Sequence, residues 1–126
     1  MKITLCGSTK FKQEFELTNR LLTKRGHLVY SVSWYSHSGD EVSKDLHERL
    51  DLIHLMKIKD SDAICLVGHD HSKDHGIYVG NGLKREMLWA ILNDKKVLYL
   101  PISHGESIEK IEKSNLTDYP GHYHYE

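Results

Sequence analysis

Short β-like runs alternate with helical stretches over the first hundred residues, and this alternation restricts the possible folds more than any other feature of the sequence. Four runs are predicted to be strands: 2–6, 27–32, 62–67 and 96–101. Three stretches are predicted to be helices: about Lys10 to Arg25, about Ser43 to Lys59 with Ser43 as the N-cap, and a third that starts near Leu83. Strands that alternate with helices favour a parallel sheet covered on both faces.

Right-handed crossovers between parallel strands turn this pattern into a small doubly wound layer, flavodoxin-like or Rossmann-like. We expect an α/β domain with a parallel sheet of about four to five strands and helices on both faces. The run 62–67 is almost continuously apolar, as expected of a strand buried on both sides. Residues 1–101 are predicted to form this domain. Residues 102–126 are polar and are predicted to be a C-terminal extension that packs on the domain or on a neighbouring subunit.

The charge balance and the apolar runs argue against several classes of partner. The chain has 17 Lys and Arg against 18 Asp and Glu, so no overall field attracts a nucleic acid polymer or an anionic membrane. Its apolar runs are too short to span a bilayer or to act as a signal peptide. Cys6 and Cys65 lie in strand-like runs and are predicted to be buried free thiols in a reducing cytoplasm. Any anion must therefore be held by a local site.

A turn at the end of the first strand is the first candidate for such a site, because doubly wound sheets bind ligands beyond the carboxyl ends of their strands. It contains Gly7, Ser8, Thr9 and Lys10. A glycine allows a tight turn, free N–H groups at a helix start attract anions, and Lys10 adds a positive charge. The turn matches neither common phosphate-binding fingerprint. It is therefore either an anion site or a glycine turn followed by a Ser or Thr N-cap.

A second glycine-rich turn precedes the third helix. Gly80 and Gly82 allow the backbone to approach a ligand closely, and Asn81 between them can hydrogen-bond to it. One turn into the helix, Glu86 lies at the edge of the stripe predicted to face the sheet, which consists of Leu83, Met87, Ala90 and Ile91. Glu86 either leans toward the strand ends as a functional carboxylate or only complements the helix dipole.

The opposite side of the third helix is also apolar. Leu88, Trp89 and Leu92 are predicted to point away from the sheet. A helix that is apolar on both sides needs a second partner, so we expect a subunit interface here and a homodimer or a larger homo-oligomer.

Two further loops carry side chains that suit ligands. Trp34 and His37, together with Tyr30 and Tyr35, either stack on a planar base or cover the end of the sheet. The loop from His69 to His75 is rich in His and Asp, but its His-x-His spacing is weak as a metal motif. We interpret this loop as a polar cover and treat His122 and His124 in the same way. No metal and no cofactor is therefore predicted.

Three segments together resemble the nucleoside 2-deoxyribosyltransferase superfamily, which includes the 2′-deoxynucleoside 5′-monophosphate N-hydrolases. They are "ITLCGSTKF", "LDLIHLMKIKDSDAICLV" and "GIYVGNGLKREMLWAILNDKKVLYL". The match looks closest to the small branch found in phages and prophages, and it spans about Met1 to Pro101. The resemblance implies a flavodoxin-like domain, usually a homodimer or larger. It also implies cleavage or exchange of the N-glycosidic bond of a deoxynucleoside or its 5′-monophosphate.

The resemblance assigns a role to Glu86: a nucleophile that attacks C1′ of the sugar, as carboxylates do in retaining glycosidases. It also implies that the turn from Gly7 to Lys10 wraps a 5′-phosphate. The chain departs from the family at two positions. His54 stands where an aspartate is usual, with Asp51 one turn earlier, and Gly80 stands where an Asp or Ser is usual.

These considerations define the predicted site. Its catalytic residues are Glu86, His54 and Asp51, and its substrate or phosphate contacts are Gly7, Ser8, Thr9, Lys10, Gly80, Asn81, Gly82, Trp34 and His37. Three functions are consistent with the sequence. The first is an N-glycosidase or deoxyribosyltransferase that acts on a small nucleotide or nucleoside. The second is a protein of the same fold that binds a nucleotide or nucleotide signal without cleaving it. The third is a metal-dependent hydrolase that uses the loop from His69 to His75.

Overall fold

The computed structural model describes residues 1–32, 43–73 and 76–121 of the chain. Their centre is a five-stranded sheet in the order β2-β1-β3-β4-β5. Four strands are parallel and the last runs antiparallel to β4: β1 (Lys2–Cys6), β2 (Leu28–Tyr30), β3 (Ala63–Leu66), β4 (Lys96–Tyr99) and β5 (Thr117–Asp118). This arrangement confirms the α/β fold with a mostly parallel sheet that the alternation of elements predicts. The strand order reverses at β1 and β3, where doubly wound folds place their ligands.

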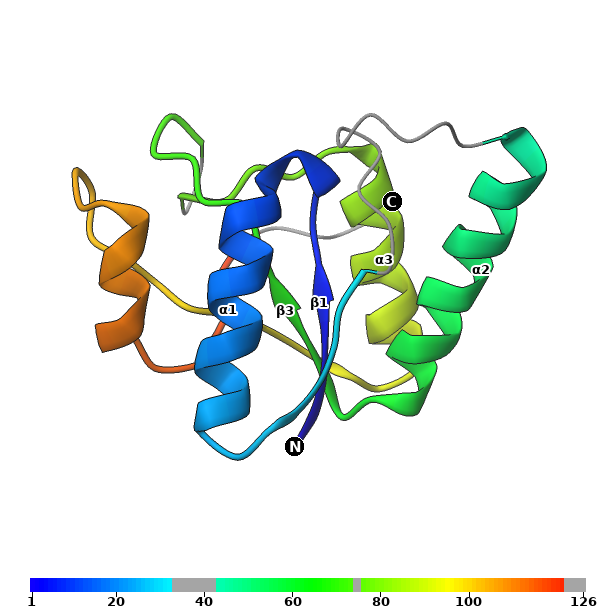
Figure 1. Ribbon diagram of the computed structural model, residues 1–126, viewed down its shortest axis with the longest axis horizontal. Helices are drawn as coiled ribbons and strands as arrows, with labels where there is room; N and C mark the ends of the chain where they lie inside the picture. The colour runs from blue at the N-terminus through cyan, green and yellow to red at the C-terminus, as the bar shows by residue number, and fades with distance from the viewer. Residues whose placement is uncertain (33–42, 74–75, 122–126) are drawn as a thin grey trace.

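Helices cover both faces of the sheet (Figure 1). The helix α1 (Lys12–Lys24) and the 3-10 helix η3 (Ile108–Lys113) pack on one face, and α2 (Lys44–Asp60) and α3 (Asn81–Leu92) pack on the other. Each face has its own apolar core, and β1 and β3 contribute to both because their side chains alternate. No helix of the described residues is long and apolar enough to cross a membrane.

The helix ends follow from local chemistry. Ser43 has extended backbone angles and its hydroxyl accepts the Leu46 N–H at 3.2 Å, which confirms Ser43 as the N-cap of α2. The first helix begins later than predicted, because Thr9–Phe11 form a separate 3-10 turn (η1) capped by Ser8. Gly26 follows the end of α1 with φ of 91°, the left-handed conformation that stops helices.

The two cysteines lie on opposite faces of the sheet and are both free and buried, as predicted. Cys6 belongs to the core beneath α2 and α3, whereas Cys65 belongs to the core beneath α1. Only Cys6 is therefore on the same side of the sheet as the helices that carry His54 and Glu86.

The segment after Pro101 contributes to the same cores. It supplies β5, and it buries Ile111 in the core beneath α1 and Tyr119 in the core beneath α3. Tyr119 packs edge-on against Tyr99 of β4, with ring centroids 5.4 Å apart. Residues 102–121 therefore pack on the sheet of this chain, and the division of the chain at residue 101 stays a prediction.

Candidate active site at the carboxyl end of the sheet

The turn after β1 passes very close to the end of β3. A Cβ atom at Gly7 would lie 2.1 Å from the carbonyl oxygen of Val67, far inside contact distance. Only glycine allows the backbone to turn here. The predicted phosphate turn, residues 7–10, therefore lies at the point where the strand order reverses.

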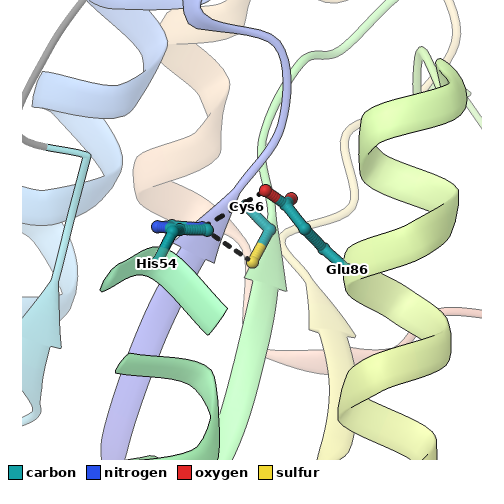
Figure 2. A group of neighbouring side chains, drawn as sticks. All are labelled: Cys6, His54 and Glu86. Atoms are coloured by element: carbon teal, nitrogen blue, oxygen red, sulfur yellow. Dashed lines mark hydrogen bonds and ion pairs between the residues drawn. The ribbon is translucent and has the colours of Figure 1, made fainter. Parts of the chain in front are cut away.

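Three side chains from three elements meet beside this turn (Figure 2). Cys6 comes from the last position of β1, His54 from α2 and Glu86 from α3. The Nε2 atom of His54 lies 3.5 Å from the Sγ of Cys6 and 3.5 Å from the Oε1 of Glu86. Glu86 therefore points into the molecule toward the strand end rather than outward. The tertiary contacts favour the first of the two interpretations of Glu86, a carboxylate aimed at the strand ends.

Burial governs the electrostatics of this group. Burial, together with the negative charge of Asp51, raises the pKa of Glu86 from 4.5 to about 7, although Arg85 opposes the change. Burial, together with the positive charge of Lys57, lowers the pKa of His54 from 6.5 to about 4. Each pKa shift favours the neutral form of its residue over the charged form. Near pH 7 the His54 ring is therefore neutral, and its 3.5 Å contact with Glu86 is not an ion pair.

Asp51 lies farther out along α2. Its Oδ2 atom is 3.6 Å from Arg85 and 3.4 Å from His47, and the Asp51 side chain is about half exposed. The ion pair with Arg85 joins α2 to α3 directly beside Glu86. Asp51 thus affects Glu86 through its charge, while His54 is the residue that contacts Glu86 directly.

Lys10 extends from the turn after β1 toward the loop before α3. Its Nζ atom lies 3.9 Å from the centroid of the Tyr78 ring, a cation–π contact. Tyr78 also lies beside Gly80, where an added Cβ would be 3.4 Å from the Tyr78 ring. The two predicted ligand turns therefore meet at Tyr78. Gly80 is the N-cap of α3 and provides no capping side chain, while Asn81 and Gly82 form the exposed start of that helix.

Glu14 is a buried carboxylate of α1 that was not among the predicted site residues. It accepts hydrogen bonds from the N–H groups of Gly68 and His69, and the Nδ1 of His69 lies 3.1 Å from it. The Nε2 of His69 donates to the carbonyl of Leu100 at 2.7 Å. Glu14 falls three residues after Phe11, on the apolar stripe of the helix. This spacing could have indicated from the sequence that Glu14 is buried.

The contacts of His69 and His71 argue against a metal site in the loop from His69 to His75. Both ring nitrogens of His69 are engaged by protein atoms, so His69 anchors the loop to α1 and β4 rather than presenting a free ligand atom. The Nε2 of His71 donates to the carbonyl of Glu106 at 2.8 Å. Several residues named from the sequence as ligand contacts or possible metal ligands lie outside the described part of the chain: Trp34, Tyr35, His37, Asp74, His75, His122 and His124.

The outer side of α3 differs in part from the prediction. Trp89 packs against the core of its own chain and donates its indole N–H to the carbonyl of Leu55 at 3.0 Å, so part of the apolar surface assigned to a subunit interface is covered by α2. Four large apolar side chains on the adjacent helices α2 and α3 are exposed: Leu52, Ile53, Met56 and Leu92. The homodimer stays a prediction.

No family model and no curated protein sequence matches the chain. Solved structures do match it. The CMP N-glycosidase BcmB of Clostridium botulinum aligns with a TM-score of 0.53 and 20% identity, over 90% of this chain and 82% of that one. A 2-deoxyribosyltransferase of Bacillus psychrosaccharolyticus aligns with a TM-score of 0.58 and 16% identity, over 94% of this chain and 99% of that one.

The strand order of the chain and these two alignments both support the α/β fold expected from the sequence. The chain therefore shares the fold of these two proteins, in agreement with the superfamily that its sequence resembles.

Proposed function

We propose that the protein cleaves or transfers the N-glycosidic bond of a 2′-deoxynucleoside 5′-monophosphate or a deoxynucleoside, with Glu86 as the nucleophile. The observation that carries this proposal is the position of the Glu86 carboxylate. It lies at the carboxyl end of β1, largely buried, in contact with His54 and with a pKa near 7. A largely buried carboxylate that titrates near the working pH at the carboxyl end of a sheet is typical of an active site.

The reaction has two steps. One carboxylate oxygen of Glu86 forms a bond to C1′ as the bond between C1′ and the base nitrogen breaks. The electron pair of the broken bond leaves with the base, which takes up a proton from solvent, and the acceptor of the second step returns a proton to solvent. Water or an acceptor base then attacks C1′ and releases the Glu86 carboxylate. With water the second step gives hydrolysis, and with an acceptor base it gives transfer.

His54 holds Glu86 rather than acting as an acid. With a pKa of about 4, almost no His54 is protonated near pH 7, so it is a poor proton donor for the leaving base. As a neutral ring it can donate one hydrogen bond from Nε2 to the ionised carboxylate at the observed 3.5 Å, a distance that shortens readily when substrate orders the site. His54 thus serves as the positioning residue where the family uses an aspartate.

A 5′-phosphate fits the groups around Tyr78. Lys10 supplies a positive charge, the turn at Gly7 and Ser8 supplies backbone N–H groups, and the N-terminus of α3 at Gly80 has no side-chain cap. The cation–π contact of Lys10 is worth about 1 kcal/mol, so a phosphate dianion would displace it readily. These groups favour a monophosphate over a nucleoside.

Base release is the decisive assay. The protein is incubated with each deoxynucleoside, each deoxynucleoside 5′-monophosphate and the matching ribonucleotides, since one structural neighbour is described as acting on CMP. Free base is then measured by chromatography. We expect release that is lost in Glu86→Gln and Glu86→Ala and kept in Glu16→Gln, a control at an exposed glutamate of α1. Nucleotide binding without release in the unmodified protein would instead support the non-catalytic binding protein.

A further inference from the structure

The group formed by Cys6, His54 and Glu86 has the composition and spacing of a zinc site. Its thiol, imidazole and carboxyl ligand atoms all lie within 4.8 Å of one another, and His54 Nε2 is 3.5 Å from each of the other two. In a tetrahedral site with Zn–S near 2.3 Å and Zn–N near 2.0 Å, neighbouring ligand atoms are about 3.3 to 3.6 Å apart. The side chains therefore need little movement to surround an ion.

The chemistry of the three groups also suits a thiophilic divalent cation. A neutral imidazole has a lone pair on one ring nitrogen, and when its proton is on Nδ1 the Nε2 atom of His54, which faces Cys6 and Glu86, can bind a metal. The charge of Zn²⁺ would be balanced by one thiolate and one carboxylate, which gives a neutral centre that can be buried at small cost. The Glu86 side chain is 21% exposed, so solvent reaches the group on this side, where a zinc ion would take water as its fourth ligand.

We propose that Cys6, His54 and Glu86 bind one Zn²⁺ ion and that the bound ion inhibits the protein. On binding, the ion replaces the proton of the Cys6 thiol, which passes to solvent, and also that of Glu86 where the carboxyl is protonated. Glu86 then donates its lone pair to the metal and cannot attack C1′. The binding step stands on the geometry alone, whereas the inhibition rests on the proposed function.

Binding is tested first, without reference to activity. The protein is titrated with Zn²⁺ by calorimetry and with Co²⁺ by absorption spectroscopy, because only thiolate ligation produces an intense near-ultraviolet charge-transfer band. We expect one equivalent to bind, with affinity that rises with pH as the thiol loses its proton. Cys6→Ser should abolish the band, and both Cys6→Ser and His54→Gln should weaken Zn²⁺ binding by at least about tenfold.

Cys65→Ser is the matched control, because this second buried thiol lies on the other face of the sheet. It should leave the band and the affinity unchanged. Circular dichroism establishes that each variant is folded, and His54→Gln keeps the test decisive if Cys6→Ser does not fold. Zn²⁺ affinity that is equal in the unmodified protein and in the folded site variants would overturn the proposal, since it would place the ion on other histidines of the chain.

Inhibition is tested separately by base release with and without Zn²⁺, each variant being compared with its own metal-free rate. Zn²⁺ should suppress the rate of the unmodified protein and of Cys65→Ser, and a chelator should restore it. A rate that increases with bound Zn²⁺ would overturn the inhibitory role. Absence of base release under all conditions would refute the proposed function and leave the binding result standing.

Discussion

Replacing Glu86 with glutamine should stabilise the protein increasingly as the pH rises. Glutamine keeps the size of the side chain and its hydrogen-bonding capacity but cannot ionise. In the native protein the Glu86 carboxyl ionises only near pH 7, whereas in the unfolded chain it ionises near 4.5. A native pKa raised above the unfolded value means that the native state holds the proton more tightly. The resulting stability is complete below pH 4.5 and is lost as the pH rises toward 7.

The size of this effect follows from the displacement of the pKa. Each pH unit between the two pKa values corresponds to about 1.36 kcal/mol, so ionised Glu86 costs the native state about 3 kcal/mol above pH 7. At pH 5 the ionisation of Glu86 lowers the free energy of unfolding by less than about 1 kcal/mol. The advantage of Glu86→Gln over the unmodified protein should therefore grow by about 2 to 3 kcal/mol between pH 5 and pH 8. His54 titrates in both proteins, so its contribution largely cancels in the difference.

The assay is urea unfolding at several pH values between 5 and 8, followed by circular dichroism. Each value is the difference in the free energy of unfolding between Glu86→Gln and the unmodified protein. Glu16→Gln is the control, since Glu16 is exposed on α1 and its replacement should give a small difference that does not vary with pH. A difference for Glu86→Gln that stays constant across this range would refute the conclusion that burial disfavours the ionised carboxylate.

Three further predictions follow from the site and its support. The kcat/KM for a nucleoside substrate should rise with pH up to about 7 and then level, because Glu86 must be ionised to attack; a flat initial-rate profile from pH 5 to 8 would contradict its role as nucleophile. Glu14→Gln should lower the free energy of unfolding by about 2 to 3 kcal/mol in urea titrations, because the hydrogen bonds from Gly68 and His69 are buried; a loss within the error of the measurement would show that the carboxylate is not needed. Gly7→Ala should cost at least about 2 kcal/mol in the same assay, because its Cβ would collide with the Val67 carbonyl. By contrast, Gly82→Ala, where nothing lies within 4 Å, should be neutral or stabilising by up to about 1 kcal/mol, and equal effects of the two changes would disprove the close approach at Gly7.

Much of the fold could be predicted because its signals are local. The alternation of strand and helix patterns predicts the parallel sheet, and the N-cap at Ser43 and the glycine at position 26 mark helix ends within one residue of those observed. The misplaced start of α1 has a local cause as well, because Ser8 caps a 3-10 turn that has no distinctive apolar period. Ile111 and Tyr119 were missed because they are isolated apolar residues in a polar segment.

The direction of side chains was harder to predict than the elements that carry them. Trp89 lies on the side of α3 away from the sheet, where periodicity alone suggests solvent or a partner. The adjacent helix α2 fills that space, and Trp89 hydrogen-bonds to its Leu55 carbonyl. A periodic pattern shows which residues share a face, but the position of neighbouring helices decides what that face contacts.

The sequence by itself determined the order of strands and helices, the apolar stripes and the glycine turns at the strand ends. Through its resemblance to a known superfamily, it also led to the proposal that Glu86 is the nucleophile. Only the tertiary structure decided how Glu86 is placed chemically. Cys6, His54 and Glu86 come from β1, α2 and α3, so no local spacing could show that they touch. Their pKa values depend on how completely those three elements exclude water, and desolvation is a property of the packed site rather than of any one segment.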